Sequence, residues 1–225
     1  MERLIILGAG SRPNSIGQRC DIVEVASGDK TYRLMIDCGM EFIREDEIGG
    51  RGPSPDFSLF EDGKKIDALL LTHSHVDHCG SAAVAVRKKL LKDDACIFAA
   101  PQTAAVLPIV LQDGLKQNAP FNVLDAVHTL FLPGGENRIK IFLQPGEFEL
   151  FPGFKIFAAP AGHILGACSL VIPTSSGRKG LITGDICWHD QPLLKGALPP
   201  SRGWPREWIP DEIWGTDLTY GGGTK

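Results

Sequence analysis

The feature that most constrains the fold of this chain is the apolar run 68–71, which leads directly into the polar segment Thr72–His78, THSHVDH. Three of the six histidines and one carboxylate lie in this segment. Alternate residues of an extended backbone point to the same side, so His73 and His75 can hold one metal ion together. The segment therefore predicts a strand that ends in a metal site, and we favour this over a polar surface loop that happens to be rich in histidine.

Asp77 and His78 follow in the same segment and are expected to face a second metal position. A structural zinc site more often uses cysteines in paired short spacings, whereas histidine and aspartate suit an open catalytic site that keeps a bound water. The six cysteines of this chain show no such spacing, so we expect reduced, mostly buried thiols and disfavour both disulfides and metal ligation. They are Cys20, Cys38, Cys79, Cys96, Cys168 and Cys187.

Many strand-like runs with few helical patterns between them indicate a layered α/β domain. The strand-like runs are 3–7, 21–26, 32–36, 68–71, 96–99, 140–143, 154–159, 169–172, 180–182 and 212–215. Helical patterns cover 80–91, 103–116, which Pro108 interrupts, and more weakly 123–131. With 225 residues, 43% of them hydrophobic, the chain can form one large domain or one domain and a fragment. We expect the chemistry on loops at the strand ends.

Three isolated polar residues, Asp37, His163 and Asp185, follow other predicted strands. A glycine precedes His163 and another precedes Asp185, which we interpret as letting the backbone approach a bound ion closely. Taken singly, His163 is as often an ordinary loop histidine, and the two aspartates more often begin turns or cap helices. Their joint occurrence with the segment Thr72–His78 favours one shared site.

Other features bear on competing functions. Gly8-Ala9-Gly10 follows a strand, as in a dinucleotide-binding turn, but Pro13 stands close to where the helix should begin, so we disfavour that function. No apolar run reaches the roughly 18–20 residues that cross a bilayer, and the N-terminal apolar run is too short for a secretory leader. We therefore expect no membrane contact and a cytoplasmic location.

The formal net charge of −4 counts against nucleic-acid binding, which normally leaves a basic footprint. The densest basic cluster is Arg87, Lys88, Lys89 and Lys92. We expect it to be the solvated face of a helix rather than a track for phosphates.

In chain order, Asp37, the segment His73–His78, His163 and Asp185 resemble the first four motifs of the metallo-β-lactamase superfamily. This resemblance implies the αβ/βα sandwich of that superfamily. It covers nearly the whole chain.

Three stretches resemble one branch more narrowly, the β-CASP nucleases that process RNA and DNA, including the pre-mRNA 3′-end cleavage endonuclease. They are Ala161–Ala167, AGHILGA; Thr183–Asp185, TGD; and Thr216–Gly221, TDLTYG. The third is the weakest, because the branch often has glutamate at the position of Asp217.

The resemblance implies that His73, His75 and His163 bind one zinc ion, that Asp77 and His78 bind a second, and that Asp185 bridges both. It further implies that Asp37 orients a ligand histidine and that Asp217 is an active-site acid. Two divalent ions about 3.5–4 Å apart lower the pKa of a bridging water and place the hydroxide in line with a phosphodiester phosphorus. The implied activity is zinc-dependent hydrolysis of RNA phosphodiester bonds.

The remaining polar residues near these motifs are expected to have local roles. Thr72 and Ser74 lack a base partner that is not already assigned to metal, so we interpret them as hydrogen-bonding residues that shape the loop. His189 matches no motif of the family, and His128 lies in a helical pattern. We assign surface or packing roles to both.

Two parts of the family pattern have no counterpart before Lys225: a further histidine ligand for the second metal, and the inserted β-CASP domain after the Asp217 motif. We therefore expect residues 1–225 to be an N-terminal portion of the domain that ends where the insertion would begin, or a naturally short relative. The fold should be incomplete at its C-terminus, with an open sheet edge unless a partner covers it. The first metal position should be complete and the second one ligand short, and the isolated chain should cleave RNA inefficiently.

Three functions stay open on the sequence. The preferred one is a β-CASP-type ribonuclease with RNA, or else single-stranded DNA, as its substrate. The alternative is another hydrolase of the superfamily acting on a thioester, lactone or small phosphodiester, which the acidic charge favours. The third is a non-catalytic binding module, which the intact ligand set disfavours. The sequence does not fix the native metal, endo- versus exonucleolytic cleavage, or association with itself or with a missing C-terminal half.

Overall fold

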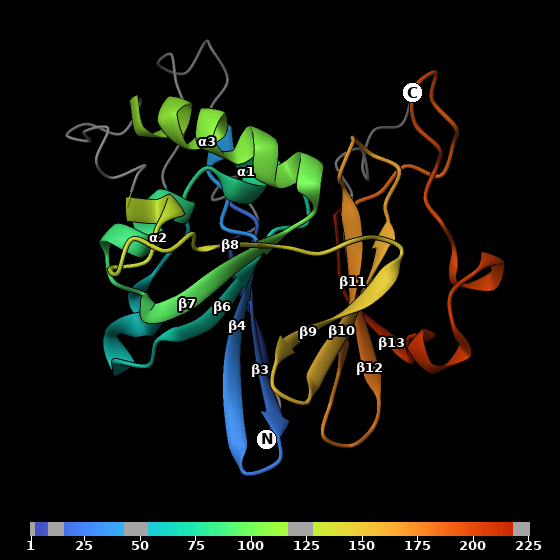
Figure 1. The fold of residues 1–225 in the computed structure, drawn as a ribbon, viewed down its shortest axis with the longest axis horizontal. Helices are drawn as coiled ribbons and strands as arrows, with labels where there is room; N and C mark the ends of the chain where they lie inside the picture. Colours follow the sequence, from blue (N-terminus) through green and yellow to red (C-terminus); the bar gives the residue numbers. More distant parts are fainter. Residues whose placement is uncertain (1–2, 9–15, 43–53, 117–127, 218–225) are drawn as a thin grey trace.

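The computed structural model describes residues 3–8, 16–42, 54–116 and 128–217 (Figure 1). Two β-sheets pack face to face, helices lie over the outer face of the first, and a segment without an α-helix crosses the outer face of the second. This arrangement confirms the predicted layered α/β class. Incompleteness at the C-terminus stays a prediction.

The first sheet is built from strands between residues 3 and 141. Its strands are β1 (Arg3–Gly8), β3 (Cys20–Ser27), β4 (Lys30–Ile36), β6 (Ile66–Leu70), β7 (Leu91–Ala99) and β8 (Ile139–Ile141), in the order β1-β3-β4-β6-β7-β8. Because β4, β6, β7 and β8 are parallel, the loops that leave their carboxyl ends lie at one edge. The helices α1 (Val76–Cys79), α2 (Ala82–Arg87) and α3 (Pro101–Lys116) lie over the outer face (Figure 1).

The second sheet follows in sequence. Its strands are β9 (Gly146–Phe151), β10 (Phe154–Pro160), β11 (Cys168–Pro173), β12 (Lys179–Asp185) and β13 (Glu212–Asp217), in the order β13-β12-β11-β10-β9. All neighbouring pairs are antiparallel except β12 and β13, which are parallel. The other described elements are the ribbon β2 (Ile16–Gly17) with β5 (Glu41–Phe42) and the 3-10 helices η2 (Ser58–Asp62), η3 (Pro200–Arg202) and η4 (Arg206–Trp208).

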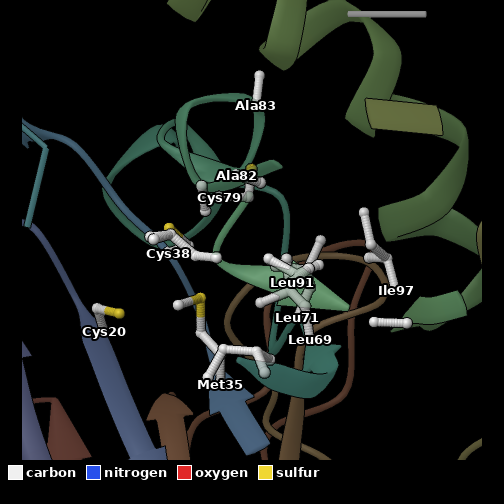
Figure 2. Close-up of a cluster of buried hydrophobic side chains, with 14 of the residues drawn as sticks. Cys20, Met35, Cys38, Leu69, Leu71, Cys79, Ala82, Ala83, Leu91 and Ile97 are labelled. Atoms are coloured by element: carbon white, nitrogen blue, oxygen red, sulfur yellow. The ribbon is translucent and has the colours of Figure 1, made fainter. Parts of the chain in front are cut away.

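The apolar run that opened the sequence analysis is buried on both faces. Successive residues of a strand point to opposite faces, so Leu70 packs between the two sheets while Leu69 and Leu71 face the helices. Figure 2 shows the helix-side cluster, in which Leu69 and Leu71 lie with Met35 and Ile97. A strand covered on both faces must be apolar throughout, which explains the uninterrupted run.

A third apolar cluster covers the outer face of the second sheet. Trp208 stacks on Phe157 with ring centroids 5.7 Å apart, and Trp204 packs on it at a tilt with centroids 5.3 Å apart. The Trp204 indole donates a 2.8 Å hydrogen bond to the carbonyl of Leu198. The tryptophans thus fix the segment carrying η3 and η4 onto the sheet.

Several expected elements differ from the observed ones. Of the helix expected over 80–91, only 82–87 are helical, as α2; α1 lies before this range, and the last residue of the range, Leu91, begins β7. The helix expected over 103–116 is continuous as α3 with Pro108 inside it, and β9 was not predicted. The expected helix 123–131 lies largely outside the described residues.

The basic cluster is exposed, as predicted, but it does not lie on one helix. Arg87 ends α2, Lys88 and Lys89 lie in the following turn, and Lys92 lies in β7, where it pairs with Asp67. Lys92 is near the amino end of a parallel strand, at the edge of the sheet opposite to the loops described below.

Candidate metal centre

The polar residues singled out in the sequence gather at one end of the sandwich. Asp37 follows β4, the segment Thr72–His78 follows β6, His163 follows β10, and Asp185 is the last residue of β12. The amide of Cys168, at the start of β11, donates a 3.0 Å hydrogen bond to the carbonyl of Thr72. This bond joins the two sheets where the polar residues meet.

Four side chains bring one donor atom each to a common point: His73, His75, His163 and Asp185, whose donor atoms all lie within 4.8 Å of one another. His73 Nε2 and His163 Nε2 are each 3.1 Å from His75 Nδ1. Asp185 Oδ2 is 3.2 Å from His163 Nε2 and 3.9 Å from His73 Nε2. His73 and Asp185 are buried, whereas His75 and His163 are partly exposed.

This donor set fits a zinc ion. Four ligands arranged tetrahedrally at about 2.0–2.1 Å from zinc stand about 3.3 Å from one another. Of the four separations given above, three, 3.1, 3.1 and 3.2 Å, are close to that spacing, one is 3.9 Å, and all donor pairs lie within 4.8 Å. The combination of three imidazoles and one carboxylate also suits other divalent transition metals.

The protonation states agree with metal binding. Burial lowers the pKa of His73 well below 6.5, and the neighbouring His78 adds to this effect. Burial likewise lowers the pKa of His75 and of His163, although Asp185 opposes the shift in both. The three imidazoles are therefore neutral near pH 7, and neutral imidazole is the form that ligates metal.

Asp77 and His78 lie next to this group and share Asp185 with it. His78 Nε2 is 3.1 Å from Asp185 Oδ1 and 4.0 Å from Asp77 Oδ2. Burial alone would lower the pKa of His78, but Asp37, Asp185 and Asp77 together raise it to about 10. These contacts place positive charge on His78 where three carboxylates converge, and a divalent cation there could replace the Nε2 proton.

Asp37 fixes the orientation of His78. One carboxylate oxygen accepts the Thr72 backbone N–H at 2.8 Å, and the other accepts the Thr72 hydroxyl and His78 Nδ1–H, each at 2.7 Å. Holding the proton on Nδ1 turns Nε2 toward Asp185. These contacts are those expected of a residue that orients a ligand histidine, the role that the resemblance implies for Asp37.

The two glycines before His163 and Asp185 have a different role from the expected one. Gly184 has φ +58°, and a Cβ there would lie 2.8 Å from Thr72 Cβ. Gly162 has φ +72°, and a Cβ would lie 2.3 Å from the amide nitrogen of Ala197. Both glycines are required by left-handed backbone and by close contact with other protein segments, which accounts for them without any approach to an ion.

The remaining predicted residues are placed as follows. Asp217 ends β13, where its backbone is in register beside Asp185. Thr72 hydrogen-bonds to Asp37, which lies on another strand end 35 residues earlier, and not only within its own loop. His128 and His189 are exposed. The six cysteines are all free thiols, four of them buried, and none belongs to the donor group found among the described residues.

Sequence reasoning missed two groups beside the site. Arg19 Nη2 pairs with the buried Asp21 at 2.6 Å, and the Arg19 amide bonds the carbonyl of Asp77 at 3.0 Å. Gln191 Nε2 donates to the carbonyls of Gly162, at 2.7 Å, and His163, at 3.1 Å. Asp21, a charged residue within a predicted strand, could have indicated the first pair. The sequence around Gln191 contains no pattern that indicates its contacts.

Comparison with known proteins agrees with the site. A family model described as the metallo-beta-lactamase superfamily matches residues 19–202. Among curated proteins, Endoribonuclease ysh1 of Emericella nidulans is 28% identical over 197 residues, which cover 86% of this chain and 21% of that protein. RNase J-like protein of Methanocaldococcus jannaschii is 31% identical over 173 residues, which cover 76% of this chain and 34% of that protein.

Cleavage and polyadenylation specificity factor 73 of Drosophila melanogaster is 28% identical over 213 residues, which cover 94% of this chain and 28% of that protein. The chain thus spans between 21% and 34% of the length of these three relatives. Within the described part of the chain, no helix is long and apolar enough to cross a membrane.

Proposed function

This chain belongs to the metallo-beta-lactamase superfamily, and on that premise we propose that it is the metal-binding part of a zinc-dependent ribonuclease of the β-CASP branch. The names of two relatives, an endoribonuclease and an RNase J-like protein, support the branch and RNA as the substrate. Because the chain spans a minor part of each relative, RNA hydrolysis is proposed for the protein that contains this domain.

The observation that carries the proposal is the convergence of His73, His75, His163 and Asp185. These residues come from three separate segments, the loop after β6 of the first sheet and the loop after β10 and the end of β12 of the second, and two of the four donors are buried. A surface loop rich in histidine would not collect donors from such distant segments. We assign this group to one zinc ion, and Asp77, His78 and Asp185 to a second.

When bound, the divalent cations would acidify a water and neutralise charge on the scissile phosphate. The residues of the chain prepare that site. Burial keeps His73 neutral, Asp37 holds the Nδ1 proton of His78, and the carboxylate of Asp185 serves both groups. Asp217, whose backbone lies beside Asp185, is proposed as an active-site acid.

A second candidate is another hydrolase of the superfamily that acts on a thioester or lactone. The net charge of −4 favours it, because a polyanionic substrate is attracted less to an acidic protein.

The two functions differ in substrate and in salt dependence. Purified protein would be loaded with zinc, its bound metal measured, and the sample incubated with a single-stranded RNA, a DNA of the same sequence and a panel of thioesters, at about 50 and about 200 mM salt. We expect slow, chelator-sensitive cleavage of RNA that weakens at the higher salt. The double variant His73→Ala/His163→Ala should abolish cleavage, and His189→Ala, an exposed histidine at the same end, should not.

Thioester hydrolysis without RNA cleavage would replace the ribonuclease proposal by the second candidate. Protein that retains no metal after loading would contradict both.

A further inference from the structure

One tryptophan of this chain differs from the others in its surroundings. The side chains of Trp204 and Trp208 are each 8% exposed and pack on Phe157, whereas that of Trp188 is 59% exposed. Isolated exposed apolar residues are common on protein surfaces. The position of Trp188 and the loop that carries it distinguish it from such a residue.

Trp188 is three residues beyond Asp185, at the end of the sandwich where the donor group lies. Three residues of extended chain span at most about 11 Å. A substrate whose reacting group lies at Asp185 would therefore have its adjoining units within reach of the Trp188 loop.

The loop after Asp185 is held firmly against the His163 loop. The Cys187 amide donates to the carbonyl of Ala161 at 2.9 Å, and the Ala197 amide donates back to the carbonyl of Cys187 at 2.7 Å. The side-chain amide of Gln191 bonds the carbonyls of Gly162 and His163. An aromatic residue on a loop fixed at several points loses little conformational freedom when it binds a ligand.

The charge distribution indicates what such a residue would bind. The densest basic cluster lies toward the opposite edge of the first sheet, and the chain as a whole carries a net charge of −4. A nucleic acid at the metal centre therefore gains little from basic side chains, beyond what bound cations would contribute at its phosphates. Its bases must supply part of the affinity, and stacking on aromatic side chains is the usual source. Leu165 and Leu193 are also exposed on this pair of loops, at 59% and 91%, but neither has a ring that could stack on a base.

We propose that Trp188 is a base-stacking platform for single-stranded RNA, holding a base close to the phosphodiester that occupies the metal centre. This inference rests on the proposed function and adds a binding subsite to it. Trp188 acts on substrate position and takes no part in metal binding.

The test measures RNA binding separately from cleavage. Fluorescence anisotropy would be recorded in chelator with two labelled oligomers of equal length, oligoadenylate and an abasic ribose-phosphate chain of equal charge. We expect wild type to bind oligoadenylate more tightly than the abasic chain. Trp188→Ala should weaken oligoadenylate binding about 5- to 100-fold, the range typical of alanine substitution at stacking sites, and should leave abasic binding unchanged.

Three control variants separate stacking from other effects. Trp188→Phe keeps a ring and should retain most of the preference, whereas Trp188→Leu keeps an apolar side chain without a ring and should lose it. Leu193→Ala, on the same loop, should bind like wild type. Thermal unfolding and sedimentation of each variant would establish that fold and oligomeric state are unchanged.

The outcomes distinguish the two proposals. Equal oligoadenylate binding by wild type and Trp188→Ala would overturn the stacking role and leave the ribonuclease proposal intact. A change in self-association without a change in RNA binding would make Trp188 a protein contact and would also overturn it. Wild type that binds neither oligomer and cleaves no RNA would overturn the proposed function and the stacking role together.

Discussion

Replacing Asp37 by asparagine tests how the second group of side chains is oriented. The new side chain would have the shape of the aspartate, and asparagine tolerates the left-handed backbone that Asp37 adopts at φ +60°. One carboxylate oxygen becomes an NH₂ group. If the amide oxygen keeps the Thr72 backbone N–H, the amide nitrogen faces His78 Nδ1, which now carries a proton that Asp37 accepts at 2.7 Å.

Two donors cannot face each other, so the neutral His78 that binds a cation must either leave its Nδ1 proton unsatisfied or carry that proton on Nε2. The second choice protonates the atom that lies 3.1 Å from Asp185 and that would ligate the cation. Leaving a buried donor unsatisfied costs about 1–3 kcal/mol. Binding of a cation by His78 should therefore weaken about 5- to 150-fold, at about 1.4 kcal/mol for each factor of ten. This range agrees with the roughly 10- to 100-fold effect typical of residues that orient metal ligands.

Two measurements check the Asp37→Asn prediction. Competition with a chromophoric chelator at neutral pH would give the affinity of each zinc ion, and we expect the weaker one to change while the tighter one stays within about twofold. Imidazole ¹⁵N resonances in chelator would follow the titration of His78. The pKa of about 10 should fall in the variant, because the charge of Asp37 is the largest influence that raises it.

Asp21→Asn is the matched control for losing a buried carboxylate, because Asp21 pairs with Arg19 rather than with a residue of the donor groups. Wild-type zinc affinity and an unchanged His78 titration in Asp37→Asn would refute the orienting role. Equal weakening by both variants would also refute it.

Three further predictions concern the fold and the first metal position. His163→Ala should weaken binding of the tighter zinc ion at least about 100-fold, measured by chelator competition, because this substitution removes a proposed ligand and not only a residue that orients one. His189→Ala should have no effect on zinc affinity. Gly184→Ala should lower the free energy of unfolding, measured by urea denaturation, by about 2–4 kcal/mol. Gly177 also has a positive φ but open space around it, so Gly177→Ala should cost only the backbone strain of about 1–2 kcal/mol. Equal losses in the two variants would contradict the packing role of Gly184. Burial raises the pKa of Asp21 from 3.8 to about 6, so between these pH values the folded chain binds more protons than the unfolded chain. The free energy of unfolding should therefore fall as pH rises through this window, by at most about 3 kcal/mol. Asp21→Asn should remove this fall, and a variant with the wild-type pH profile in chelator would contradict the prediction.

The sequence predicts those parts of the molecule in which local pattern and spatial role coincide. The run 68–71 is apolar because both faces of β6 are covered, so its burial could be predicted from composition alone. The polar residues after the strands were predicted to share a site because they occur together with the segment Thr72–His78, each following a predicted strand. Their separations, and the carboxylate of Asp185 between both groups, needed the structure.

Other features could not be predicted, because they depend on contacts between segments far apart in the chain. The helical pattern over 80–91 does not show that Leu91 continues into β7, since apolar residues suit either element. The close contact of Gly184 with Thr72 arises only when the second sheet packs on the first. The hydrogen bonds of Gln191 to the His163 loop join segments 28 and 29 residues apart.

Thr72 links the packing of the two sheets to the geometry of the metal centre. Its carbonyl accepts the Cys168 amide of the second sheet, its backbone N–H and its hydroxyl both bond Asp37, and its side chain fills the space beside Gly184. Any separation of the sheets would therefore move Asp37 away from Asp185 and disturb both groups of donors. The coupling also acts in the other direction, because a cation that binds only the folded chain stabilises it by RT ln(1 + [metal]/Kd), about 2.7 kcal/mol at about 100 times Kd. Thr72→Val, which keeps the shape of the side chain but removes the hydroxyl, should weaken zinc binding and reduce this metal-dependent stabilisation. Unchanged zinc affinity in Thr72→Val would show that packing alone, without the bond to Asp37, sets the geometry of the site.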